Sequence, residues 1–385
     1  MTLKVQTRYG DLILNKHEYF MKMTLELAEK GRGRVSPNPM VGAVVVKNSR
    51  IISSAYHRRV GGLHAEALAL KIAGKKARGA ALYVNLEPCA HAGRTPACTD
   101  AIVKSRVKRV FCSMKDPNPV NNGHGIDLLR KNKINVSVGL LREEAQKLNK
   151  VFIKYITKNM PFVTLKIAES LDGKIATRSK DSKWITSDAS RSFAHKLRSE
   201  TDAVLVGVNT VIRDNPILTS RRFRTPVKVI LDPYLNVQER AYIFSKKSPA
   251  LNIIAILKKS LDKKAAIQKI RRLNKKGVLV ISCPGKYGRI DLEWLLRELA
   301  ELEIAHLLVE GGGDTLAGFL ENGLADRVLF FIAPKIIGGK DAITSVEGRG
   351  VDKVNKSVKL EDIKVERIGE DVLIRANIKS LQLKA

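Results

Sequence analysis

The chain has 385 residues, with 69 Lys or Arg against 38 Asp or Glu, and a net charge of +31 at pH 7. Its 44% hydrophobic and 28% charged residues exclude a disordered chain, and this length favours two or three globular domains. Since it has neither a run of 18 apolar residues nor a signal-peptide pattern, we expect a cytoplasmic protein without membrane association.

The first half of the chain is predicted to alternate helices and strands. About 14 residues of frayed extension are expected before the first helix, at 17–31. Two strands around a polar turn follow at 40–57, and Thr95 is the expected cap of the third helix, with Pro96 in its first turn. The remaining predicted elements are a helix at 64–79, a strand at 81–86, a helix at 95–105, strands at 107–114 and 134–140, and a helix at 141–156.

The second half reads as an α/β sheet domain that begins near residues 155–161. The basic tract 257–276 has a rough helical apolar face, so we interpret it as a solvated amphipathic helix; a nucleic-acid contact is the alternative. The predicted buried strands are 163–168, 202–208, 227–232, 252–257, 278–282, 305–310 and 327–333.

Four cysteines in so long a chain argue against a disulfide framework. Cys112 and Cys283 lie in apolar runs and are predicted to be buried thiols. The other two, Cys89 and Cys98, combine with His64 into one imidazole and two thiolates, a set that suits Zn²⁺ and leaves a fourth position open for water.

Glu66 follows the histidine by two residues, where its carboxylate can move protons without being a ligand. The arrangement is that of zinc nucleobase deaminases, H-x-E followed by P-C and a second cysteine. A purely structural zinc site is the alternative, although only three convincing protein ligands are present.

Eight residues separate the two cysteines, in place of the two in the general deaminase pattern. The surrounding motifs resemble the deaminase half of the bifunctional riboflavin biosynthesis deaminase/reductase family. One departure is Asn121–Asn122, where many members carry a more apolar pair. The matching motifs are Asn38-Pro39-Met40-Val41-Gly42, His64-Ala65-Glu66, EPCAHAGRTPAC at 87–98 and Asp116-Pro117-Asn118-Pro119.

The resemblance implies a cytidine-deaminase-like three-layer domain with four further substrate contacts. Two of them, Asn38 and Asp116, could hydrogen-bond pyrimidine amino groups, although both lie beside prolines and could be turn residues. The full set is Asn38, His57, Arg94 and Asp116.

The second half has one local signal of its own, a strand that runs into three glycines and a helix at 305–320. Such a loop can bind phosphate, or can be a plain tight turn. With the segments 166–176, 182–187 and 197–221 it resembles the reductase half of the same family, which implies a dihydrofolate-reductase-like fold and NADPH as cofactor.

The resemblance also implies site residues in this half. Lys166 and Glu310 are candidates for polar groups around the reacting ribose carbon, whereas Trp184 could instead be core. Lys228 and Arg222 are candidates for the 2′-phosphate contact. The implied cofactor contacts are Ala168, Trp184, Thr210, Asp214, Gly312, Gly313, Asp314, Thr315, Leu316, Ala317 and Gly318. The implied substrate contacts are Lys166, Ser182, Arg198, Leu218, Arg221 and Glu310.

We therefore expect an N-terminal extension at 1–14, a zinc deaminase domain at 15–155 and an NADPH-dependent reductase domain at 161–385. One Zn²⁺ per chain and NADPH are the expected cofactors, and phosphoribosylaminopyrimidines the substrates. We expect the protein to assemble as a homo-oligomer. We expect no nucleic-acid partner. The alternative function is a zinc-dependent tRNA or nucleic-acid base deaminase, which the net charge of +31 favours and the cysteine spacing does not.

Overall fold

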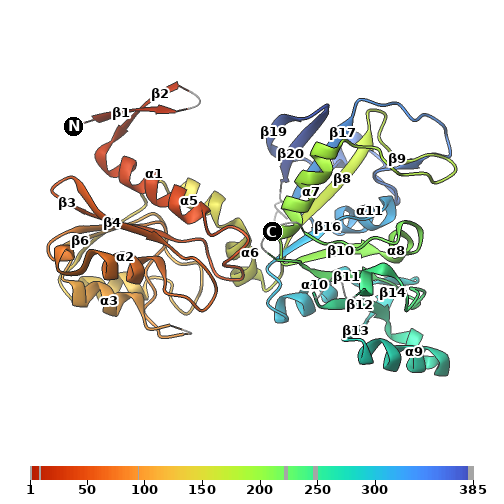
Figure 1. Ribbon diagram of the computed structural model, residues 1–385, viewed down its shortest axis with the longest axis horizontal. Coiled ribbons are helices and arrows are strands. Elements are labelled where there is room, and N and C mark those ends of the chain that lie inside the picture. The colour runs from red at the N-terminus through yellow and green to blue at the C-terminus, as the bar shows by residue number, and fades with distance from the viewer. Residues whose placement is uncertain (1, 8–9, 94, 221–223, 246–249, 380–385) are drawn as a thin grey trace. The chain divides into compact units, whose positions relative to one another are not determined.

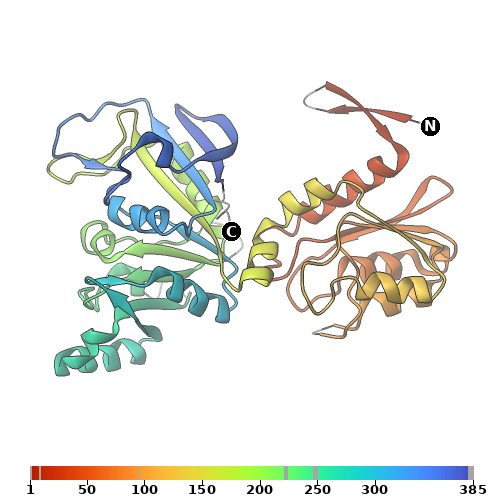
Figure 2. The same cartoon turned by 180° about the vertical axis from the view of Figure 1, so that it is seen from behind.

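The computed structural model of the chain describes residues 2–7, 10–93, 95–220, 224–245 and 250–379. They form two compact units, Met1–Asn159 and Met160–Ala385. Figure 1 and, from behind, Figure 2 show that each unit is built on its own central sheet with helices on its faces. None of the helices in the described ranges is long and apolar enough to cross a bilayer.

The first unit has a five-stranded sheet in the order β4-β3-β5-β6-β7. β3 is antiparallel to β4 and β5, and β6 is parallel to β5 and β7. The strands are β3 (Gly42–Lys47), β4 (Arg50–Tyr56), β5 (Ala81–Val84), β6 (Arg109–Cys112) and β7 (Asn135–Val138). The helices are α1 (Lys16–Glu29), α2 (Ala65–Ala73), η1 (Gly74–Ala77), α3 (Cys98–Ser105), α4 (His124–Lys131), α5 (Arg142–Leu148) and α6 (Lys150–Lys158).

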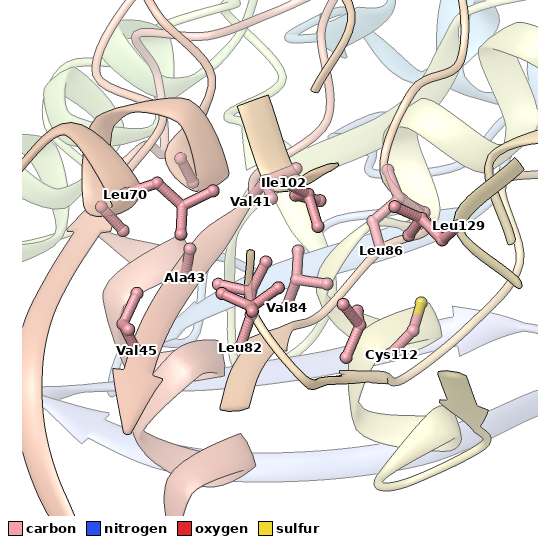
Figure 3. Close-up of a cluster of buried hydrophobic side chains, with 14 of the residues drawn as sticks. Val41, Ala43, Val45, Leu70, Leu82, Val84, Leu86, Ile102, Cys112 and Leu129 are labelled. Atoms are coloured by element: carbon pink, nitrogen blue, oxygen red, sulfur yellow. The ribbon is translucent and has the colours of Figure 1, made fainter. Parts of the chain in front are cut away.

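Alternation along β3 sends side chains to both faces of this sheet and so produces three layers. Ala43 and Val45 pack with buried residues of α2, α3 and α4, a cluster drawn in Figure 3. Val44 and Val46 pack on the opposite face against Phe20 of α1. Cys112 belongs to the first cluster and Cys283 to the core of the second unit, so both thiols are buried as predicted.

Three local predictions for this unit are wrong. The expected frayed extension contains two antiparallel strands, β1 (Thr2–Thr7) and β2 (Gly10–Asn15). Thr95 does not cap α3, which begins at Cys98. The N-cap position is occupied by Ala97, which makes no side-chain hydrogen bond to the helix. The expected helix 141–156 is two helices separated at Asn149, because this buried side chain bonds both the N–H and the carbonyl of Met40.

The second unit has a nine-stranded sheet in the order β13-β12-β11-β10-β16-β8-β17-β20-β19. All its pairs are parallel except the two that β20 makes with β17 and β19. Its strands are β8 (Phe162–Ser170), β10 (Ala203–Gly207), β11 (Val227–Leu231), β12 (Asn252–Leu257), β13 (Val278–Cys283), β16 (His306–Val309), β17 (Arg327–Ala333), β19 (Leu360–Ile368) and β20 (Asp371–Ile378).

All seven buried-strand predictions for this unit coincide with strands of the sheet. The hairpin β19–β20 and the short strands β9 (Lys174–Ala176), β14 (Gly285–Lys286), β15 (Arg289–Ile290) and β18 (Ile343–Thr344) were not predicted. The helices are α7 (Asp188–Glu200), α8 (Val208–Asp214), η2 (Tyr242–Phe244), η3 (Lys258–Asp262), α9 (Lys264–Lys275), α10 (Leu292–Glu301), α11 (Gly313–Glu321) and η4 (Val354–Lys356). The basic tract forms η3 and α9 and buries Leu273, which confirms the amphipathic helix.

Candidate active sites

The three predicted metal ligands meet at the starts of α2 and α3. His64 precedes α2, Cys98 is the first residue of α3, and Cys89 follows β5. Their ligand atoms lie within 4.8 Å of one another, with His64 Nδ1 at 3.2 Å from Cys98 Sγ and 3.6 Å from Cys89 Sγ. Ideal tetrahedral Zn–N and Zn–S bonds would place such atoms about 3.6 Å apart. The trio therefore fits a zinc ion.

The environment of the two sulfurs favours a thiolate. A hydrogen bond from the Cys98 thiol lowers the pKa of Cys89 to about 4, and the backbone N–H of Cys98 also donates to Cys89 Sγ at 3.2 Å. The pKa of Cys98 is raised by the shared hydrogen bond and by burial, so one proton remains between the pair. A divalent cation would displace that proton, because metals bind the deprotonated sulfur.

Thr95 contributes to this site in a way that the sequence did not predict. Its Oγ1 lies 3.3 Å from His64 Nε2. A partner on this nitrogen leaves Nδ1, which faces the two sulfurs, as the ligand atom of the imidazole.

Glu66 lies in the first turn of α2, with only 3% of its surface exposed. Burial and the neighbouring Cys89 raise the pKa of its carboxyl group to about 7 in the absence of a metal. A carboxyl group that titrates near neutrality can both accept and return a proton.

A hollow of about 160 Å³ brings Glu66, His64 and Cys89 together with three of the four predicted substrate contacts, Asn38, His57 and Asp116. Asn38 Nδ2 lies 3.3 Å from His57 Nε2. Burial raises the pKa of Asp116 and lowers that of His57. The fourth predicted contact, Arg94, lies outside the described residues.

Glu87 is a buried carboxylate that sequence reasoning missed, although it is part of the quoted motif. Its Oε2 accepts the N–H groups of Asp116 and Gly123 at 3.0 and 2.9 Å, and its Oε1 those of Gly125 and Ile126 at 2.9 and 3.2 Å. Four donors from the loop after β6 and the first turn of α4 converge on this carboxylate, which therefore sets the backbone that presents Asp116.

Asn121, the departure from the family pattern, strengthens the same loop. It is fully buried, donates to Asp116 Oδ2 at 3.2 Å and accepts the N–H of Ala90 at 2.9 Å. The Asn121 side chain thus links Ala90, in the loop after Cys89, with the carboxylate of Asp116. These two hydrogen bonds explain why a polar residue is suitable at a position where an apolar one is usual.

Replacing Glu87 by glutamine should destabilise this loop by about 2–4 kcal/mol, since hydrogen bonds to a charged group contribute about 1.5–3 kcal/mol each and the new NH₂ group would face two donors. Hydrogen exchange at the amides of Gly123, Gly125 and Ile126 measures the effect directly. The same change at exposed Glu143 should leave these amides protected. Unchanged exchange in Glu87→Gln would show that the loop is held by other contacts.

The second unit has a larger hollow, of about 550 Å³, at the carboxyl ends of β10 and β16. Gly312 precedes α11 and faces open space, since an added Cβ would meet no atom within 4 Å. An added Cβ on Gly313, in contrast, would approach the carbonyl oxygen of Thr344 to 2.7 Å. The glycine pair thus leaves the start of α11 bare and accommodates close packing, as an anion site at a helix N-terminus needs.

Many predicted cofactor contacts line this hollow, but not all. Leu316 and Ala317 are buried and only 1% exposed, so their side chains are not available to a ligand. Trp184 is 64% exposed and stacks beneath the Arg191 guanidinium at 4.5 Å, so the core-packing alternative is wrong. The predicted residues on the lining are Ser182, Thr210, Asp214, Gly312, Gly313, Asp314, Thr315 and Gly318.

Lys166, Arg198 and Glu310 form a separate, partly buried charge cluster, outside the described lining of that hollow. Arg198 donates two hydrogen bonds to Glu310, at 2.6 and 2.8 Å, and Lys166 Nζ lies 4.0 Å from Glu310 Oε2. Burial lowers the pKa of Lys166, although Glu310 opposes the shift. Two cations around one carboxylate leave a net positive charge that could attract an anionic ligand.

The remaining predictions in this unit divide into three groups. Leu218 lies in the core at 6% exposure, and Ala168 packs against Phe331 and Leu373. Arg221 and Arg222 lie outside the described residues. Lys228 is fully buried and donates to the carbonyl of Ile243 at 2.7 Å, so it is unsuited to contact the 2′-phosphate.

A zinc-binding deaminase unit followed by a dihydrofolate-reductase-like unit is thus the class of protein that fold and sites define. Residues 14–114 match the cytidine and deoxycytidylate deaminase zinc-binding region, and residues 161–374 match the RibD C-terminal domain. The chain belongs to the riboflavin biosynthesis protein RibD family.

Relatives resemble the chain over nearly its whole length. The riboflavin biosynthesis protein RibD of Aquifex aeolicus is 48% identical, over 92% of this chain and 96% of its own. The RibD protein of Escherichia coli is 36% identical, over 93% of this chain and 98% of its own. The solved structure of Acinetobacter baumannii RibD has a TM-score of 0.85 at 32% identity, and covers 95% of this chain and 99% of its own.

A Thermotoga maritima structure extends the comparison. It is described as a diaminohydroxyphosphoribosylaminopyrimidine deaminase/5-amino-6-(5-phosphoribosylamino)uracil reductase. Its TM-score is 0.81 at 39% identity, over 94% of this chain and 99% of its own. The predicted fold class is confirmed in both halves, as is the bifunctional class of enzyme with zinc and NADPH as cofactors.

Proposed function

We propose that the chain catalyses two reactions of riboflavin biosynthesis. The first is hydrolytic deamination of 2,5-diamino-6-(5-phosphoribosylamino)pyrimidin-4-one. The second is NADPH-dependent reduction of the ribosyl group of 5-amino-6-(5-phosphoribosylamino)uracil to the ribityl form. The observation that carries the proposal is the trio of His64, Cys89 and Cys98 with Glu66 beside it, in a chain that matches deaminase and reductase families in turn.

In the deaminase site, bound zinc would lower the pKa of water to about 7. Glu66 accepts the proton that the water loses and passes it to the ring nitrogen. It then transfers the proton of the newly added hydroxyl group to the departing amino group, which leaves as ammonia. Asn38 and Asp116 orient the pyrimidine through its amino groups, and His57 supports Asn38. Arg94 is assigned to the ribose phosphate through the resemblance alone.

In the reductase site, bound NADPH would supply a hydride to the ribose carbon that is attached to nitrogen. The bare start of α11, with Gly312 and Thr315, binds the cofactor phosphates, while Thr210 and Asp214 contact the rest of the cofactor. Arg198, held by Glu310, and Arg221 bind the substrate phosphate, and Lys166 polarises the reacting carbon. Lys180 and Arg213, two further cations on the lining, are available for the remaining negative charge of the cofactor.

We assign the deaminase to residues 15–155, the reductase to 161–385 and the N-terminal extension to 1–14. The division of the chain between Asn159 and Met160 supports the boundary. The substrates are small phosphorylated pyrimidines. Assembly as a homo-oligomer and a cytoplasmic location stay predictions.

A coupled assay with Cys98→Ser tests the proposal. The purified chain receives the diaminopyrimidinone substrate and NADPH, and ammonia release and NADPH loss are followed together. Serine is a poorer zinc ligand than a thiolate, so the variant should lose most of its zinc and its ammonia release, yet oxidise NADPH when given the deaminated intermediate. Cys283→Ala, which removes a buried thiol of the second unit, should keep its zinc. Full zinc occupancy with full deamination in Cys98→Ser would contradict the assignment.

A further inference from the structure

The first unit has a second hollow, of about 300 Å³, for which the two proposed reactions have no use. It lies at the start of α1, the β3–β4 turn and the beginnings of β5 and β6. Its lining residues are Lys16, His17, Val46, Lys47, Asn48, Ser49, Gly79, Ala80, Ala81, Tyr83, Lys108, Arg109 and Phe111. We call it the basic hollow.

The basic hollow lies at the opposite end of the strands from the zinc trio. Cys89 and Asp116 follow β5 and β6, whereas Ala81 and Arg109 are the first residues of the same two strands. A strand of this length spans about 13 Å. The described linings of the two hollows have no residue in common.

Four cationic side chains surround the basic hollow, and its described lining contains no carboxylate. Two of the cations have polar contacts, Lys47 Nζ with the carbonyl of Arg78 at 2.9 Å and Lys16 Nζ with Ser49 Oγ. Lys108 and Arg109 make no ion pair with an Asp or Glu in the part of the chain that the structure describes. The concave surface therefore concentrates positive charge that is available to an anion.

An ordered set of rings forms one wall. The rings of Tyr83 and Phe111 are nearly parallel, 8° apart in orientation with centroids at 4.7 Å, and the His17 ring lies against Phe111 at 4.5 Å. A hydrogen bond of 2.8 Å between His17 Nδ1 and the Tyr83 hydroxyl links the set. Tyr83 is buried, while His17 and Phe111 are half-buried and so present ring surface to the hollow.

Cations without acidic partners beside aromatic rings suit a ligand that has both a phosphate group and a planar ring. The volume is at the lower end of the roughly 300–1,000 Å³ of small-molecule sites, which suits a mononucleotide better than a dinucleotide. We infer that the basic hollow is a second ligand site of the deaminase unit, which binds a phosphorylated compound of mononucleotide size. Lys108 and Arg109 hold the phosphate, and His17 and Phe111 contact the ring.

The test is calorimetric titration of the zinc-loaded full chain with AMP, ribose 5-phosphate and inorganic phosphate, in 0.15 M salt. Lys108→Glu/Arg109→Glu reverses the two unpaired charges. Lys263→Glu/Lys264→Glu makes the same change of net charge on exposed residues of the second unit and is the matched control. AMP binding should weaken at least about tenfold in the first variant and stay unchanged in the control. Retained ammonia release would show that the first variant is folded.

Two results would overturn the inference. Equal AMP affinity in the wild type and in Lys108→Glu/Arg109→Glu would place any binding elsewhere. Equal affinity for AMP, ribose 5-phosphate and inorganic phosphate would show that the ring wall contacts nothing. The readout is binding and not turnover, so the inference can fail while the proposed deaminase function holds, and the reverse.

Discussion

Replacing Glu66 by glutamine is expected to lower the rate of ammonia release by about 10²–10⁴-fold, the usual contribution of a general acid–base group. Glutamine preserves size and polarity but cannot titrate. The zinc ligands are not changed, and metal content should therefore stay near one per chain. The reductase should still work on the deaminated intermediate. Metal analysis, ammonia release and NADPH oxidation on one preparation measure all three.

The matched control is Glu26→Gln, the same chemical change on the exposed surface of α1. It should leave ammonia release unaltered. Near-normal ammonia release in Glu66→Gln would remove this carboxylate from the mechanism. Loss of NADPH oxidation with the deaminated intermediate would show instead that the two sites depend on each other, and the domain assignment would need revision.

Gly312→Asp should weaken NADPH binding by roughly 10–100-fold, the effect of one or more charge-assisted hydrogen bonds lost to phosphate. Gly312 has φ −73° and ψ 171°, an extended conformation that any residue adopts, and its added side chain has free space. Aspartate is a favoured N-cap, so α11 should remain intact. Its carboxylate would occupy the N–H groups that the phosphates need and would repel them.

Gly312→Asn separates charge from bulk, because asparagine caps equally well and is neutral. It should weaken binding less than Gly312→Asp. Titration of the cofactor by NADPH fluorescence gives both affinities, and a thermal melt confirms that the helix is retained. If both variants bind NADPH as the wild type does, the start of α11 is not the phosphate site.

Local patterns predicted most elements correctly, and the failures have tertiary causes. The helix at 141–156 is interrupted because Asn149 bonds the backbone of Met40, a residue 109 positions away. Thr95 has the chemistry of a cap, but its hydroxyl is directed to His64. Lys228 has the charge for a phosphate contact, but β11 places it in the interior. Periodicity and propensity contain no information on contacts so distant in the chain.

The sequence by itself determined the chemistry of the zinc site, because ligand type and the proximity of Glu66 to His64 are written in residue identities and short spacings. It also determined the alternation of buried strands and helices in both units, because that alternation is local. Only the tertiary structure decided that Glu87 binds four backbone amides between Asp116 and Ile126, and that Arg198 and Lys166 share one partly buried carboxylate. The basic hollow likewise depends on segments from 16 to 111 that meet only when the sheet forms, since strand pairing brings together residues that no sequence spacing connects.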